Sequence, residues 1–388
     1  MPNINLPNLS PDSPRPLIGN FELTRKCPLN CLICYNERRE SPEMTLEEIK
    51  SYIDQLVDLG GLYINITGGD PLIHPHFCEV YEYCCEKGLR VSVETSCVYL
   101  KEEHIHVFQK YQPIILYISI YAVTKQTMHS VTQSQIDPNT VINNLQQLKA
   151  NKVNFTLRTP FSRLNIHEAH LIERVANQLN VPYESTVKLF WKQSGERCVS
   201  WRCTSEDLQP LRKNGKIYEK LYQEAVILET KNIVRRPCYA GLYDFFINAY
   251  GELEFCITFS KPHYDLKKGT LRAAWEKWYP HYRRLRENYC IGKKLNIGPM
   301  DACPAWYILQ HPDFDCSKSL NERVEDEIQR LRYDGLSTEE ICEKLDITYR
   351  DYDYFNSNST KKISKHWSLI YGGIKSSIHP PVFIDKDC

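Results

Sequence analysis

The sequence lacks long apolar runs and lacks an excess of charge of either sign. No apolar segment reaches the ~18 residues that a membrane-spanning helix requires, and residues 1–16 have no apolar core of the kind found in secretory signals. Lys plus Arg and Asp plus Glu number 48 each, so the chain as a whole does not attract nucleic acid or an anionic membrane. Internal repeats and low-complexity segments are also missing. We therefore expect a cytoplasmic protein that binds neither membranes nor nucleic acid.

Cysteine, in contrast, is abundant, with 16 residues in a chain of 388. Without an export signal these thiols are expected in a reducing compartment, where clustered cysteines are more often metal ligands than disulfides. A chain of this length fits two or three structural units. Cysteine clusters at ligand spacing are therefore the first candidates for a functional site.

From about residue 21 to residue 187, short apolar runs alternate with amphipathic helical patterns. Helices are expected at 74–87, 138–150 and 166–179, and a further helix begins at the capping-box spacing Thr45-Leu-Glu-Glu48. Repeated βα units predict a parallel sheet or barrel, in which ligands gather at the carboxyl ends of the strands. The expected strands are 17–24, 62–66, 90–94, 114–121 and 153–158.

Further along the chain the periodicity changes to that of a β-hairpin. Residues 243–249 and 252–257 predict two strands joined at Tyr250-Gly251, and residues 271–287 predict a helix. The last part of the chain is charged and helical in pattern. We therefore expect an N-terminal extension (1–16), a barrel (17–232), a small cysteine-rich hairpin and helix domain (233–320) and a C-terminal helical segment (321–388).

Three cysteines lie close together directly after the first expected strand. The run Cys27-Pro-Leu-Asn-Cys31-Leu-Ile-Cys34 places three thiolates on one short loop, where they can ligate three irons of a cubane cluster. The fourth iron then has no protein ligand and stays open to a bound molecule. Half of a zinc site is the alternative for three cysteines at this spacing.

The segment Thr67-Gly68-Gly69-Asp70-Pro71 ends the second expected strand. Consecutive glycines allow a backbone to approach a ligand closely, and the N–H and C=O groups here can grip the amino and carboxylate ends of an amino acid. Taken alone, such a segment is a common turn. Its position, on the βα loop that follows the cysteine run, favours a ligand-binding role.

Together, the cysteine run and the Gly-Gly-Asp-Pro segment resemble the radical S-adenosylmethionine (SAM) superfamily, over about residues 16–180. Asp70 departs from the usual GGEP motif of that family. The resemblance implies an α/β fold, a partial (β/α)6 TIM-type barrel, with a 4Fe–4S cluster on Cys27, Cys31 and Cys34 and SAM at the open iron. It implies reductive cleavage of SAM to a 5′-deoxyadenosyl radical that abstracts hydrogen from the substrate. A donor such as flavodoxin or ferredoxin is expected to supply the electron.

By the same resemblance, residues at the ends of the expected strands lie near SAM. For Ser119 a strand-end polar group, and for Asn165 a helix cap, are the alternative interpretations. No general acid or base is assigned, because an ionisable residue without known geometry carries little weight. The candidate cofactor contacts are Tyr35, Gly68, Gly69, Asp70, Pro71, Thr95, Ser96, Ser119, Arg158, Asn165 and Ile166.

A second group of cysteines begins at the expected hairpin. Cys238, Gly251 and Cys256 form the spacing C-x12-G-x4-C, which resembles the opening of the SPASM and twitch domains that bind auxiliary Fe–S clusters. Where those domains continue with C-x-x-C-Pro, Met300 replaces the first cysteine, so we expect one auxiliary cluster. Zinc, or thiols without a metal, is the alternative. The candidate ligands are Cys238, Cys256 and Cys303, with Cys316, Cys290 or an open site in the fourth position.

A barrel with such an extension resembles enzymes that modify peptides. The leading hypothesis is a ribosomally made peptide substrate that receives a thioether or C–C crosslink, or is epimerised or oxidised. One alternative is a twitch-type small-molecule radical dehydrogenase; another is an Fe–S sensor or nucleic-acid-binding protein that uses residues 335–356. About 17 residues precede the barrel, too few for a recognition domain, so leader recognition is expected in the C-terminal segment or in another protein.

Overall fold

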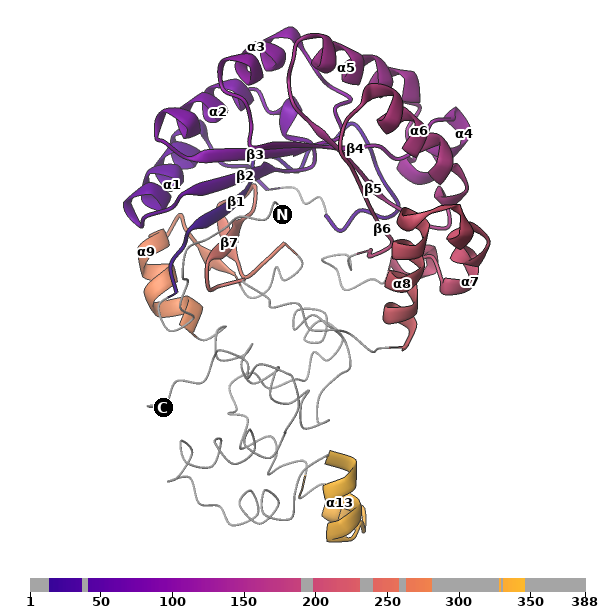
Figure 1. Ribbon diagram of the computed structural model, residues 1–388. Helices are drawn as coiled ribbons and strands as arrows, with labels where there is room; N and C mark the ends of the chain where they lie inside the picture. Colours follow the sequence, from indigo (N-terminus) through magenta and orange to yellow (C-terminus); the bar gives the residue numbers. More distant parts are fainter. Residues whose placement is uncertain are drawn as a thin grey trace. The chain divides into compact units, whose positions relative to one another are not determined.

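Alternating strands and helices make up the first of two units, which contains Arg15–Tyr279 (Figure 1). Pro280–Cys388 belong to the second unit. The candidate site lies within the first unit. The computed structural model describes residues 14–36, 41–189, 198–230, 240–257, 263–280, 328 and 331–345.

Six parallel strands form the larger part of the curved, nine-stranded sheet of the first unit: β1 (Ile18–Glu22), β2 (Tyr63–Thr67), β3 (Arg90–Thr95), β4 (Ile115–Ser119), β5 (Thr156–Pro160) and β6 (Tyr183–Thr186). Each strand pairs with its neighbour in the sequence. Helices cover the outer, convex face of this sheet in Figure 1: α1 (Leu46–Asp58), α2 (Phe77–Glu86), α3 (Glu102–Lys110), α4 (Lys125–Thr132), α5 (Pro138–Ala150) and α6 (Ala169–Leu179). The predicted partial (β/α)6 barrel is therefore confirmed.

The start of α1 shows how the local sequence produces these elements. The Thr45 N–H donates to Glu48 Oε2 (2.8 Å), and the Glu48 N–H donates to Thr45 Oγ1 (3.2 Å). This capping box, which the spacing predicted, stabilises a helix by about 1 kcal/mol. Ile49, Ile53 and Leu56 recur at helical spacing and are fully buried, so α1 packs one apolar face against the sheet.

The predicted hairpin forms, but it continues the barrel sheet. β7 (Asp244–Ile247) and β8 (Glu252–Glu254) pair antiparallel, and Gly251 between them has a φ of +80°, which favours glycine. β7 also pairs in parallel with β1, and β9 (Tyr264–Asp265) pairs with β8. The sequence analysis did not foresee this, because pairing with a distant strand leaves no local pattern. The domain boundary at 232/233 stays a prediction, although the first unit runs to Tyr279.

One further long helix, α8, and several short elements complete the described part of the chain. The helix expected at 271–287 is described only as far as residue 280. Within the described ranges, none of the helices combines the length and the apolar character needed to cross a membrane. These elements are η1 (Pro71–Ile73), η2 (Ile166–Glu168), η3 (Cys198–Trp201), α7 (Ser205–Leu208), η4 (Gln209–Asn214), α8 (Lys216–Thr230), α9 (Leu271–Ala273), the π-helical turn η5 (Ala274–Trp278) and, in the second unit, α13 (Thr338–Leu345).

The inner face of the sheet carries polar side chains. Asn65 Nδ2 donates to Asn20 Oδ1 (3.4 Å), and Ser92 Oγ donates to Asn65 Oδ1 (2.9 Å). These three residues are register partners on β1, β2 and β3. Because successive strand residues face opposite sides, the alternate residues Ile64 and Ile66 are buried on the outer face. The inner face is therefore suited to a hydrophilic ligand.

Candidate functional site

The three predicted cluster ligands lie on the loop that leaves the carboxyl end of β1, residues 23–36, here named the cysteine loop. Backbone hydrogen bonds of 2.9 Å run from the N–H groups of Asn30 and Leu32 to carbonyl groups in the last turn of α4. The Cys34 N–H donates to Cys31 O (3.1 Å) in a turn between two of the ligands. The chain itself therefore shapes the cysteine loop.

The three thiols are near enough to influence one another. Burial raises the pKa of the Cys31 thiol, and the neighbouring Cys34 and Cys27 raise it further, whereas a hydrogen bond with Tyr121 opposes the rise. Within the described ranges, no three Cys, His, Asp or Glu side chains form a group that could hold a single metal ion. In a cubane, each thiolate binds its own iron. Three soft thiol donors on one short loop fit an iron–sulfur cluster, and a bound metal would lower the pKa of each thiol and hold it as a thiolate.

Gly68 and Gly69 pack directly against the cysteine loop. A Cβ on Gly69 would lie 2.1 Å from Lys26 O, and a Cβ on Gly68 would lie 2.6 Å from Thr24 O. The Gly69 N–H donates to Thr24 O (2.6 Å), and the Asp70 N–H donates to Lys26 O (2.9 Å). The expectation that these N–H groups grip an amino acid therefore needs correction for Gly69 and Asp70, because the chain already uses both donors.

Asp70 fastens this segment to the loop that follows β3. Its buried carboxylate accepts hydrogen bonds from Thr95 Oγ1 (2.7 Å), from the Ser96 N–H (3.1 Å) and from Ser96 Oγ. It also accepts from the Leu72 N–H (3.2 Å) in η1, whose first residue is Pro71. Burial raises the pKa of Asp70, and these hydrogen bonds oppose the rise. The departure from GGEP thus places a short carboxylate where it holds two candidate cofactor contacts.

Replacing Asp70 by Asn is expected to weaken the use of SAM. An amide has one acceptor oxygen instead of two, so a donor of Thr95 or Ser96 loses its partner, at a cost of about 1–3 kcal/mol. We expect KM for SAM to rise about tenfold in an assay of 5′-deoxyadenosine formation, the equivalent of ~1.4 kcal/mol. Asp54→Asn, which removes a surface ion pair with Lys87, is the control. An equal KM in the two variants would refute this role of Asp70.

Arg158 lies on the inner face, where one guanidinium contacts two carboxylates. Its Nη1 is 3.3 Å from Glu94 Oε1 on β3, and its Nη2 is 3.1 Å from Glu184 Oε2 on β6. The guanidinium carbon also lies 3.5 Å from the centre of the Tyr117 ring on β4. Arg158 was one of the residues predicted to lie near SAM. An anionic ligand that reached this side chain would have to compete with Glu94 and Glu184.

Asn165 joins the loops that follow β4 and β5. It is fully buried, its Nδ2 donates to Tyr121 O (3.0 Å), and its Oδ1 accepts from the Ser162 N–H (2.8 Å). Asn165 stands at the N-cap position of η2, as the helix-cap interpretation expected, but its side chain forms no capping hydrogen bond and binds the two loops instead. Ser119, the last residue of β4, hydrogen-bonds to the Tyr121 side chain. Both candidate cofactor contacts therefore contact Tyr121, which in turn contacts the cysteine loop.

The remaining predicted residues are Tyr35, at the end of the cysteine loop, and the candidate ligands of the auxiliary cluster. Burial, with Glu22 and Cys34 nearby, holds the pKa of Tyr35 well above its ordinary value. Cys256 follows β8 and is partly buried. The auxiliary cluster stays a prediction, because its other candidate ligands lie outside the described residues. Those ligands are Cys238, Cys290, Cys303 and Cys316.

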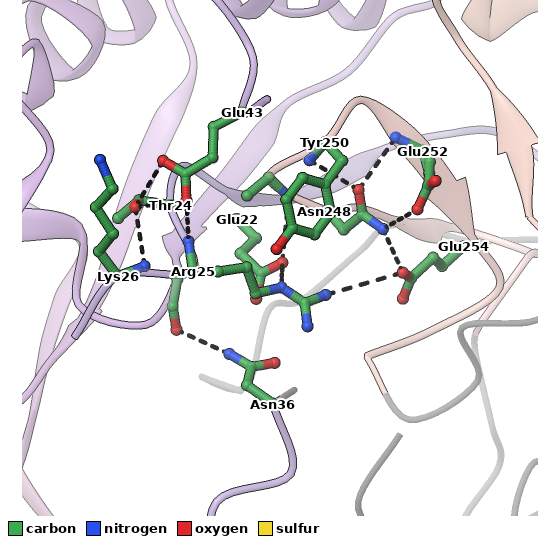
Figure 2. A network of polar contacts seen from close by, with 12 residues as sticks. Glu22, Thr24, Arg25, Lys26, Asn36, Glu43, Asn248, Tyr250, Glu252 and Glu254 are labelled. Carbon is green, nitrogen blue, oxygen red and sulfur yellow. Dashed lines mark hydrogen bonds and ion pairs between the residues drawn. The ribbon is translucent and has the colours of Figure 1, made fainter. Parts of the chain in front are cut away.

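The sequence analysis missed a buried charged network beside the cysteine loop (Figure 2). Arg25 Nε donates to Glu22 Oε2, and Arg25 Nη2 lies 4.0 Å from Glu254 Oε1. Burial raises the pKa of both carboxyl groups, and the charge of Arg25 between them opposes the rise. The available signal was the charged pair Glu22 and Arg25, three residues apart, at the end of an apolar strand and just before Cys27. The partner on β8 leaves no local signal.

The fold and the site together define the class of this protein. A parallel partial barrel whose first βα loop carries three neighbouring thiols is typical of an enzyme with an iron–sulfur cluster at the carboxyl ends of its strands. Residues 21–175 match the family model of the Radical SAM superfamily. Residues 21–175 therefore form a radical SAM domain, and the chain is an enzyme of the radical SAM type.

Relatives and solved structures resemble the chain beyond that domain. It is 26% identical over 355 residues to the antilisterial bacteriocin subtilosin biosynthesis protein AlbA of Bacillus subtilis, covering 83% of this chain and 75% of that protein. It is 21% identical to the AdoMet-dependent heme synthase of Methanosarcina barkeri, covering 73% and 88%. The structure of Streptococcus suis SuiB bound to precursor peptide SuiA has a TM-score of 0.56 at 14% identity, covering 69% and 67%. The SuiB comparison shows a shared fold.

Radical SAM enzymes use a 4Fe–4S cluster and SAM, and the donor set described above fits the cluster. Cys27, Cys31 and Cys34 would hold it. When bound, the cluster and SAM supply the one-electron chemistry that removes hydrogen from an unactivated carbon. The chain's own residues position that chemistry: Tyr121 hydrogen-bonds the Cys31 sulfur, and Asp70 holds two loops of the site together.

Proposed function

We propose that this radical SAM enzyme modifies a ribosomally made peptide, by a thioether or C–C crosslink, by epimerisation or by oxidation. The similarity to AlbA, a protein named for subtilosin biosynthesis, carries this proposal, because it extends over 83% of the chain and not only over residues 21–175. SuiB, whose fold this chain shares, has been solved with a precursor peptide. The polar inner face of the barrel suits a hydrophilic substrate such as a peptide.

The proposal includes the parts of the catalytic system that lie around the barrel. One auxiliary iron–sulfur cluster would be held by Cys238, Cys256 and Cys303, with Cys316 or Cys290 as the fourth ligand or an open iron. An electron donor such as flavodoxin or ferredoxin would reduce the enzyme in the cytoplasm. The candidate cofactor contacts would lie near SAM, as the resemblance implies. The N–H groups of Gly69 and Asp70 are the exception, because the chain itself uses both donors.

A small-molecule substrate is the second candidate. The specific observation in its favour is the similarity to an AdoMet-dependent heme synthase, which covers 88% of that relative. A tetrapyrrole is also hydrophilic at its carboxylate edge, and Arg158 on the inner face is a group that could receive a carboxylate if Glu94 and Glu184 gave way. The two candidates differ in what stimulates SAM cleavage.

The test is an anaerobic assay of the reconstituted full chain with SAM and dithionite. Short precursor peptides encoded near its gene are added in one series, and iron-containing and metal-free porphyrins in the other. We expect a peptide to increase 5′-deoxyadenosine formation several-fold and to change in mass by loss of hydrogen, or to take up solvent deuterium if it is epimerised. Stimulation by a porphyrin and by none of the peptides would overturn the proposal in favour of the second candidate.

A further inference from the structure

Arg25 lies at the centre of a buried polar network that joins the barrel to the hairpin (Figure 2). The network consists of Glu22, Arg25, Asn248, Tyr250 and Glu254, here named the Arg25 network. Each of these side chains is more than nine-tenths buried. Charges at such depth are costly unless they are paired and hydrogen-bonded, so the contacts of Arg25 are strongly constrained.

The guanidinium of Arg25 contacts three separate parts of the first unit. Its Nε donates to Glu22 at the end of β1, and its Nη2 lies 4.0 Å from Glu254 Oε1 on β8. Its guanidinium carbon lies 5.7 Å from the centre of the Tyr250 ring in the hairpin turn. One side chain thus connects the last residue of β1 to both the turn and the second strand of the hairpin.

The carboxylates on either side of Arg25 are themselves held from the hairpin. Glu22 Oε2 also accepts from the Ala249 N–H (3.2 Å), and Glu254 Oε1 accepts from Asn248 Nδ2 (2.6 Å). The hairpin turn therefore helps to orient Glu22 on the barrel side, and Arg25 helps to orient Glu254 on the hairpin side. A tilt of either element would break several contacts together.

Arg25 is also two residues before Cys27, in a segment whose backbone is bound on its other sides. The Arg25 N–H donates to Glu43 Oε1 (2.8 Å), and Lys26 O accepts from the Asp70 N–H (2.9 Å). The backbone contacts place this segment against the loop that follows β2 and against the segment before α1, and the Arg25 side chain reaches the hairpin from here. A groove of about 800 Å³ beside the network has walls from both elements, including Cys27 and Tyr250.

Stability alone is a weak reason for such an arrangement. A buried ion pair often contributes no more than well-packed apolar residues of similar volume, while it demands a specific geometry. One arginine between two buried glutamates is therefore better explained by the position it enforces. The position in question is that of the first cluster ligand relative to the hairpin.

We propose that Arg25 is a positioning residue that sets the orientation of Cys27, and hence of SAM at the cluster, relative to the hairpin wall of the active site. The proposal rests on Cys27 as a ligand of the radical SAM cluster and not on the identity of the substrate. A peptide substrate and a small molecule would both depend on this alignment. Failure of the peptide proposal would leave this one untouched.

The experiment compares Arg25→Met, Arg25→Lys and Glu254→Gln in the reconstituted full chain. The readout is the EPR spectrum of the reduced enzyme before and after SAM is added, together with kcat and KM for 5′-deoxyadenosine formation. We expect Arg25→Met to bind a wild-type amount of iron but to show an altered SAM-induced change in its g values. Its kcat should fall about tenfold, with a smaller change in KM for SAM. Arg25→Lys should restore part of both.

Glu252→Gln is the matched control. Glu252 lies on the same strand as Glu254 and accepts a hydrogen bond from the same Asn248 Nδ2 (2.7 Å), but it pairs with His263 rather than Arg25. We expect this variant to keep the wild-type spectrum and kcat, whereas Glu254→Gln resembles Arg25→Met. If Arg25→Met does not fold, Glu254→Gln and Arg25→Lys provide the same readout. Wild-type g values and kcat in the folded Arg25 and Glu254 variants would overturn the proposal.

Discussion

Replacing Cys27, Cys31 and Cys34 together by Ala is expected to abolish the formation of 5′-deoxyadenosine from SAM. Alanine has no metal-binding atom, so the variant loses all three protein ligands of the cluster that radical SAM enzymes require. The product should fall to the background of an assay without protein, measured by chromatography after anaerobic reconstitution with dithionite. Iron bound per chain should fall in parallel, and any iron that remains would report on the auxiliary cluster.

The same variant is expected to fold, which makes the loss of activity interpretable. The cysteine loop is held by backbone hydrogen bonds to α4 and to Gly69, and none of these bonds involves a cysteine side chain. Cys78→Ala/Cys85→Ala makes the same chemical change on α2, where both thiols are partly buried, and should keep the wild-type activity. If the triple variant still cleaved SAM above background, the assignment of the cluster to the cysteine loop would be wrong.

Local patterns in the sequence predicted a parallel sheet or barrel and the place of the cysteine loop, and the resemblance to the radical SAM superfamily implied the partial barrel. The spacing of Thr45 and Glu48 specifies a helix start within four residues, and Tyr250-Gly251 specifies a hairpin turn, because each signal depends only on neighbouring residues. The three cysteines are likewise a local motif. Their predicted place, at the carboxyl end of the first strand, follows from the alternation of strands and helices and is confirmed.

Contacts between distant residues could not be predicted in this way. Nothing near residue 18 indicates that β1 pairs with β7, and nothing near residue 25 indicates a glutamate on β8. Asn165 was identified as a candidate, but its role in joining two loops depends on partners in other loops. Arg158 was also identified, whereas the two carboxylates that balance its charge come from strands far apart in the sequence. The sequence therefore identified Asn165 and Arg158 as candidates, whereas their hydrogen-bond and ion-pair partners became known only from the structure.

Replacing Gly69 by Ala is expected to damage both stability and cluster loading. The new Cβ would lie 2.1 Å from Lys26 O and 2.7 Å from Arg25 O, and these are backbone atoms that no rotamer change can move. The loops would have to separate, which would stretch the 2.6 Å hydrogen bond from the Gly69 N–H to Thr24 O. We expect a loss of about 3 kcal/mol in the free energy of unfolding. Iron bound after reconstitution should fall to less than half of the wild-type amount.

Gly88→Ala separates this effect from the general consequences of adding a methyl group to a glycine. Gly88 has a φ of +82° and nothing within 4 Å of an added Cβ, so its replacement costs only the strain of a left-handed backbone, about 1–2 kcal/mol. Denaturant unfolding and iron analysis are carried out on both variants. Gly88→Ala reports the effect of backbone strain alone, and Gly69→Ala reports the effect of a clash with the cysteine loop. We expect Gly88→Ala to bind iron like the wild type, because the site is unchanged. If Gly69→Ala also bound iron like the wild type, the contact between Gly69 and the cysteine loop would not be what positions Cys27. Gly68 and Gly69 would then be explained by the access that they give to a ligand.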